Sequence, residues 1–176
     1  MGILRRIICV VLAVMAITAF VACDKQEAVD TQTASNNGEK SNKAGISYYI
    51  EFKGQKVQMG ADADPIIEAI GEYQDRKEIG DCGGLGAQVK YSYAAVEIFV
   101  LESKEKGNVI DQITFRTDAI TTPEGVYIGM DTAQAKEILG EPTSESQTAF
   151  EYAGDKYVLV ITVADGKVNK IDYMTV

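Results

Sequence analysis

A short pattern occurs twice in this sequence, and the repetition limits the folds that the chain can adopt. Gly60-x-Asp62 opens the first copy and Gly129-x-Asp131 opens the second, an offset of 69 residues without a gap. Each copy continues with an apolar stretch that ends at a glycine eleven residues after the first one. Further matches at the same offset are Val57 with Val126, Glu68 with Glu137 and Ile70 with Leu139. Repetition at a fixed spacing predicts a domain built from two similar halves.

Each copy predicts one short helix. In the first copy, Asp62 or Asp64 is suited to cap the helix, and Pro65 is tolerated in its opening turn. In the second copy, Asp131 is suited to the same role, and Gln134 can complete a capping box. The closing glycine of each copy favours the positive φ at which many helices end. The apolar residues fall on one face of each helix: Ile66, Ile67 and Ile70, then Ala135, Ile138 and Leu139. We therefore expect both helices to lie on a sheet.

Strand patterns follow each helix, and turn residues separate them. The first half offers residues 89–93, 96–101 and 109–115, and the second offers 149–152, 157–163 and 168–173. Residues 48–52 and 55–59 predict an additional hairpin before the first helix. The last strands of the halves match at an offset of 58: Ile110, Ile113 and Phe115 with Val168, Ile171 and Tyr173. The offset falls by eleven because residues 73–88 form a longer segment between the first helix and its strands.

The predicted fold class is α+β, with two tandem α-β-β-β repeats and an extra N-terminal β-hairpin. Repeat 1 is expected to span residues 46–120 and repeat 2 residues 121–176, so that residues 46–176 form one globular unit. The strands are expected to form an antiparallel sheet with the helices on one face. The opposite face would then be free for contact. Five strand tyrosines are the candidates to line it: Tyr91, Tyr93, Tyr152, Tyr157 and Tyr173. The alternative is that tyrosine is simply a favourable strand residue.

The N-terminus has the layout of a signal peptide. Arg5 and Arg6 precede an uncharged run over residues 7–21, which is shorter than the roughly 20 apolar residues of a membrane-spanning helix. The run ends in Phe20-Val21-Ala22-Cys23, which resembles the lipobox of bacterial lipoproteins. That resemblance implies cleavage after residue 22 and a lipid anchor on Cys23, at the extracytoplasmic face of the cell membrane. Residues 24–45 are polar with almost no large apolar side chain, and we interpret them as a disordered tether.

Charge and residue usage exclude several functions. Without Arg5 and Arg6, 15 basic and 26 acidic residues remain, a net charge of about −11, which disfavours nucleic acid as a partner. The sequence contains no histidine, so a histidine-based triad or a zinc site of the usual kind is not expected. We expect no enzyme activity, no cofactor and no metal.

Cys82 is the third cysteine of the sequence. Cys9 lies in the predicted signal peptide and Cys23 is predicted to carry lipid, so Cys82 would stand alone in the mature chain. It is either a buried small residue or a free thiol with a redox or intermolecular role.

The C-terminal half resembles a known structural unit. Its Gly-x-Asp pattern, the helix ending in Leu-Gly-Glu-Pro and the closing Asp165-Gly166-Lys167-Val168 look like the helix-plus-three-strand unit of small-protein-A type outer-membrane lipoproteins. The same unit occurs as a tandem pair in the beta-lactamase inhibitor protein. Residues 46–176 more closely resemble Firmicutes lipoproteins labelled AC-motif proteins. The matching residues are Met59-Gly60-Ala61-Asp62, Cys82 with Gly86, Tyr91-x-Tyr93, and the stretch 122–129. The resemblance implies a fold and a location, and it supplies no catalytic residue.

Three functions remain as hypotheses. The first is a non-enzymatic, membrane-anchored module that binds an envelope protein or a wall component. The second is a glycan-active enzyme that uses paired carboxylates, because carboxylates are the only plentiful acid-base groups here. The third is a redox or stress sensor that uses Cys82.

Overall fold

The computed structural model describes residues 45–81, 86–104 and 107–176. The predicted signal peptide, the lipidation residue Cys23, the tether up to residue 44 and Cys82 lie outside these residues. Their assignments therefore stay predictions from the sequence.

Ten strands and two helices make up the described part of the chain, which confirms an α+β fold dominated by antiparallel sheet. Eight strands form one sheet in the order β3-β4-β5-β6-β10-β9-β8-β7, and β1 pairs with β2 separately. The first four sheet strands are β3 (Asp75–Asp81), β4 (Ala87–Ser92), β5 (Val96–Ser103) and β6 (Gly107–Phe115). The others are β7 (Ser144–Glu145), β8 (Ala149–Ala153), β9 (Tyr157–Ala164) and β10 (Lys167–Thr175). The central pair, β6 with β10, brings the two sequence halves together.

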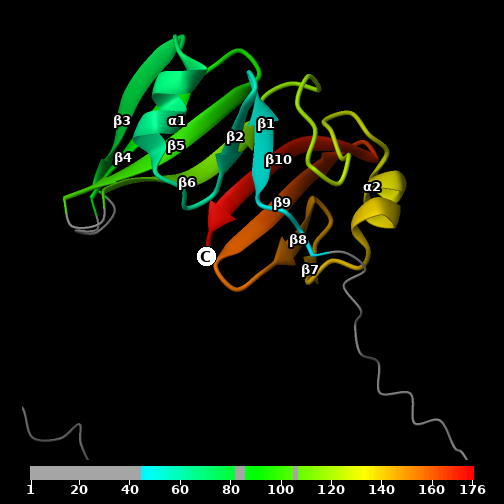
Figure 1. The fold of residues 1–176 in the computed structure, drawn as a ribbon. Coiled ribbons are helices and arrows are strands. Elements are labelled where there is room, and N and C mark those ends of the chain that lie inside the picture. The colour runs from blue at the N-terminus through cyan, green and yellow to red at the C-terminus, as the bar shows by residue number, and fades with distance from the viewer. Residues whose placement is uncertain (1–44, 82–85, 105–106) are drawn as a thin grey trace, which may run out of the picture. The chain divides into compact units, whose positions relative to one another are not determined.

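The predicted hairpin is confirmed as β1 (Tyr49–Phe52) and β2 (Gln55–Gln58). Lys53 and Gly54 make its two-residue turn, and both adopt the positive φ that such a turn requires. Figure 1 shows the hairpin and α1 in front of the large sheet.

Helices α1 (Ala63–Ile70) and α2 (Thr132–Leu139) occupy the predicted positions. Asp62 caps α1, because its carboxylate accepts a hydrogen bond from the Asp64 amide at 3.2 Å. Asp131 occupies the predicted N-cap position of α2, but its side chain makes no capping hydrogen bond. The Asp131 carboxylate lies 3.2 Å from Lys167 Nζ instead, and the Thr132 amide donates to the Gly166 carbonyl. The Asp131 carboxylate therefore contacts the Lys167 ammonium group and not the helix amides that the local sequence predicts as its partners.

The strand β3 was not expected, since it lies within the segment placed between helix and sheet. Its sequence, Asp-Arg-Lys-Glu-Ile-Gly-Asp, lacks a regular alternation of apolar and polar residues. Pairing with β4 supplies the hydrogen bonds that make it extended, so the tertiary environment decides its conformation. The short edge strand β7 likewise arises from pairing with β8.

One contiguous core lies against one face of the large sheet. The sheet contributes alternate residues, such as Ile98, Ile113 and Ile161, all fully buried. The same cluster contains buried side chains of the hairpin and of both helices: Ile50, Phe52 and Val57, then Ala63, Ile70, Ala135 and Leu139. These contacts hold the hairpin and the helices against the sheet.

The turn before each helix is bonded to a sheet strand in the same way. The Gly60 amide donates to the Ile110 carbonyl at 2.7 Å, and the Ile110 amide donates to the Ala61 carbonyl at 3.0 Å. In the other half, the Gly129 amide donates to the Val168 carbonyl at 2.7 Å, and the Val168 amide donates to Met130 at 2.9 Å. Equivalent sequence positions thus make equivalent backbone bridges.

Candidate functional site

The structure places the five candidate tyrosines toward the core and not on a free face. Tyr93, Tyr152 and Tyr173 are 2%, 4% and 0% exposed, so the expectation that they line a contact surface is wrong. Tyr91 and Tyr157 are half-buried and pack against the same core. The reason for four of them is register: Tyr91, Tyr152, Tyr157 and Tyr173 each lie two residues from a buried apolar residue of their own strand, and side chains two apart share a face. These partners are Val89, Phe150, Leu159 and Ile171.

The opposite face of the sheet carries a different set of side chains. The register aligns six residues across six strands: Lys90, Phe99, Gln112, Met174, Val158 and Ala153. We call this set the outer row. Phe99 and Val158 are half-buried and Met174 is 36% exposed, so apolar surface reaches solvent along the row. Val160 and Leu101, on the same face, extend it. The sequence held a signal for this surface, because residues 98–101 and 158–161 are apolar without alternation, which is typical of strands with apolar side chains on both faces.

Several of the charges on this outer face form ion pairs with one another. Asp172, 4% exposed, accepts a hydrogen bond from the Thr114 hydroxyl at 2.6 Å and pairs with Lys170 at 2.9 Å. Glu97 lies 3.0 Å from Lys90 and 3.6 Å from Arg116. The ion pairs fix the side chains around the apolar positions. The face therefore combines apolar area with ion-paired charges.

The two edges of the sheet are poor sites for adding another strand. β3 carries Asp75, Arg76, Lys77 and Glu78 in succession and has a register shift between Glu78 and Gly80. Charges and bulges on an edge oppose pairing with a foreign strand. At the other edge, β7 has only two residues. Contact through the outer face is therefore favoured over extension of the sheet.

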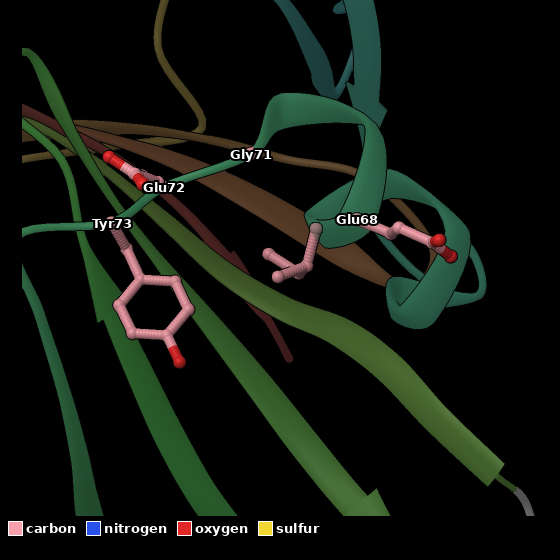
Figure 2. Close-up of a pocket in the computed structure, with 5 residues that line it drawn as sticks. Glu68, Gly71, Glu72 and Tyr73 are labelled. Carbon is pink, nitrogen blue, oxygen red and sulfur yellow. The ribbon is translucent and has the colours of Figure 1, made fainter.

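A shallow pocket of about 430 Å³ lies at the C-terminal end of α1. Its lining residues are Ile67, Glu68, Gly71, Glu72 and Tyr73. Figure 2 shows the Glu68 and Glu72 carboxylates projecting away from one another, with the Tyr73 ring below Glu72. The Tyr73 ring is 44% exposed and meets the Tyr91 ring at 5.2 Å between centroids. Two carboxylates directed apart do not make the facing acid-base pair that glycoside hydrolysis needs.

A second pocket, of about 260 Å³, lies where the described chain begins. Gly45, Ile46 and Tyr48 line one side of it, and Leu139 and Tyr152 contribute to the other. The Tyr48 hydroxyl donates to the Tyr152 carbonyl at 3.2 Å, and the Tyr152 hydroxyl donates to the Gly140 carbonyl at 2.9 Å. These bonds hold the start of the folded part onto its C-terminal half.

Glu124 strengthens the same junction. Its Oε1 accepts a hydrogen bond from the Ser47 amide at 2.8 Å, across 77 residues of sequence. Its Oε2 and the Tyr173 hydroxyl are buried without a hydrogen-bond partner in the described residues. Burial, with the Glu124 charge nearby, raises the pKa of Tyr173. This cluster ties the start of the folded part to the loop that contains Glu124.

The described residues offer no metal centre, since no three acidic or cysteine side chains among them are grouped to hold an ion. None of the helices in the described ranges combines the length and apolar character that crossing a bilayer requires.

Comparison with known proteins returns no match: no family model, no curated protein and no solved structure matches this chain.

Proposed function

We propose that this chain is a membrane-anchored extracytoplasmic lipoprotein whose folded part binds an envelope protein or a wall component without catalysing a reaction. The observation that carries the proposal is the outer row, in which four of six paired strands present an apolar side chain that is half-buried or exposed. Exposed contiguous apolar surface on a folded domain is typical of interaction sites. The lipobox-like Phe20-Val21-Ala22-Cys23 supports the anchor.

The two halves of the fold, in this proposal, are copies of one unit, each with a helix laid on the same face of a shared sheet. The matching backbone bridges of Gly60 and Gly129 support the duplication. So does the central pairing of β6 with β10, the last strand of each half. With the helices on one face, the sheet leaves its other face for a partner.

Ion pairs along this face favour a partner surface of low charge. Lys90, Arg116 and Lys170 are each within 4 Å of a carboxylate on the same face. A highly charged partner would therefore have to compete with these ion pairs. Apolar contacts around Met174 and Val158 would contribute most of the binding free energy.

Crosslinking capture from native envelopes tests the proposal. The full chain is compared with Met174→Arg on the outer row and with Ile138→Arg on α2. The two positions are a matched pair, because Met174 is 36% and Ile138 is 38% exposed. We expect Met174→Arg to lower capture of a defined partner by about tenfold or more, the loss of a central contact, while Ile138→Arg leaves it unchanged.

Unchanged capture by Met174→Arg would overturn the outer face as the contact surface. Equal losses by both variants would point to a general effect of added charge. Circular dichroism checks that each variant folds. We expect both to fold, because an arginine at a position this exposed can extend its guanidinium group into water.

A further inference from the structure

The pocket at the end of α1 combines an aromatic ring with uncompensated negative charge. Tyr73 supplies the ring, which is 44% exposed, and Ile67 supplies apolar surface beside it. Glu68 and Glu72 are both exposed, and no ion pair joins either to another described residue. The pocket thus pairs a π surface with two free carboxylates.

The nearby cations are already engaged. Lys53 Nζ donates to the Ile70 carbonyl at 3.3 Å and lies 5.3 Å from the centroid of the Tyr93 ring. Arg76 lies 2.8 Å from Glu102 and 5.6 Å from the centroid of the Tyr91 ring. The last turn of α1 contains no basic residue of its own, and the carbonyls at a helix C-terminus carry partial negative charge. The rim of the pocket is therefore negative.

The end of α2 provides an internal comparison. At the offset of 69 residues, Glu137 and Glu141 correspond to Glu68 and Glu72. Lys136 stands in place of Ile67 and Pro142 in place of Tyr73. Lys136 forms an ion pair with Glu145, so α2 has a cation in its last turn and no aromatic ring after it. The acidic spacing is common to both helix ends, whereas the second copy has no apolar residue at the position of Ile67 and no aromatic residue at the position of Tyr73.

We propose that the α1 pocket binds a lysine or arginine side chain presented by a basic segment of a partner protein. The cationic group would lie over the Tyr73 ring, and the alkyl stem would contact Ile67. Glu68 and Glu72 would rotate toward it, which their exposure allows. Residues 46–176 contain 12 basic and 22 acidic residues, and this net negative charge would attract a basic segment over a distance. The site is separate from the outer row, so failure of either proposal leaves the other standing.

Titration of the full chain with an acetylated, amidated tetralysine peptide tests the site, with backbone amide NMR shifts as the readout. We expect the largest shifts at Gly71, Glu72 and Tyr73. Glu68→Gln with Glu72→Gln should weaken binding about fivefold or more. Glu137→Gln with Glu141→Gln removes the same charge at the other helix and should weaken it less than about twofold. Tyr73→Leu should weaken binding about threefold, since it removes the ring and keeps the apolar bulk.

Three results would overturn the assignment. Equal weakening by the two double variants would show that only the overall charge matters. Equal binding of the peptide with its lysines acetylated would show that no cation is recognised. Equal or tighter binding of free spermidine would show that a small polyamine, and not a protein segment, is the occupant.

Discussion

Thr114 and Asp172 face one another across the central strand pair, and the Thr114 hydroxyl donates a hydrogen bond to Asp172 Oδ1 at 2.6 Å. Both residues are buried, although they lie on the sheet face that the core does not use. Lys170 Nζ lies 2.9 Å from the second carboxylate oxygen, Oδ2. The two contacts satisfy a charge that would otherwise be costly to bury.

Replacing Thr114 with valine should therefore destabilise the fold. The change keeps the shape of the side chain and removes two hydrogen bonds, the one donated to the Asp172 carboxylate and the one accepted from Gln112 Nε2 at 3.1 Å. The free energy of unfolding should therefore fall by about 2 kcal/mol. Urea denaturation measures it. Thr162→Val is the control, because Thr162 is half-buried on the same face and no side-chain hydrogen bond joins it to a described residue. A control loss as large as that of Thr114→Val would contradict the role of the carboxylate bond.

Removal of the hydroxyl should affect the stability of the fold differently at two buried tyrosines. The Tyr93 hydroxyl has no hydrogen-bond partner in the described residues, so Tyr93→Phe should leave stability unchanged or raise it by up to about 1 kcal/mol. The Tyr152 hydroxyl donates to the Gly140 carbonyl at 2.9 Å, so Tyr152→Phe should lower stability by about 1 kcal/mol. Thermal and urea unfolding of both variants check the signs. Equal losses would argue that the Tyr93 hydroxyl has a partner after all.

The same tyrosines predict a loss of stability in alkali. Burial raises the pKa of Tyr93 and of Tyr152 from 10.0 to about 12. The folded state thus favours the neutral phenol. Its contribution to the free energy of unfolding is fully present below pH 10 and is lost as the pH rises through 12. At pH 11 the ionisation of each tyrosine in the unfolded chain should lower the free energy of unfolding by roughly 1.4 kcal/mol. Denaturation at pH 8 to 11 measures the decline, and Tyr93→Phe should make it shallower. A decline of equal slope in that variant would rule out Tyr93 as a contributor.

Gly60 has a steric requirement that its counterpart Gly129 lacks. A Cβ on Gly60 would lie 2.0 Å from the Tyr157 hydroxyl oxygen, whereas a Cβ on Gly129 meets nothing within 4 Å. Both glycines have positive φ, 74° and 95°, so alanine adds backbone strain at each. Gly60→Ala should therefore cost about 1 kcal/mol more than Gly129→Ala, measured by urea unfolding. Combining Gly60→Ala with Tyr157→Phe should recover part of the difference. Equal costs at both glycines would show that Tyr157 moves aside freely.

The anchor can be tested by metabolic labelling with an alkyne fatty acid. Cys23→Ser should abolish labelling and release the chain from the membrane fraction, because the thiol that takes the lipid is gone. Cys9→Ser is the matched control, since Cys9 lies in the predicted signal peptide and should have no effect. Labelling that survives Cys23→Ser would refute the predicted lipobox.

Local patterns predicted most of the individual elements. The hairpin, both helices and six strands lie where alternation, capping residues and glycines indicate, because these signals act over a few residues. β3 has no such signal: its charged sequence becomes a strand by pairing with β4. Asp131 likewise shows that a local cap can be replaced by a distant partner, here Lys167.

The sequence by itself determined which side chains of a strand share a face, the acidic charge, and the lipobox-like ending at Cys23. Tertiary structure alone decided which face of the sheet is covered. In β5 and β9 both faces are apolar, so alternation could not tell the core side of Ile98 from the open side of Phe99. Packing of the hairpin and helices buried Tyr93 and Tyr173 and left Met174 in contact with water. Burial depends on contacts between residues far apart in sequence, and local periodicity contains no information about them.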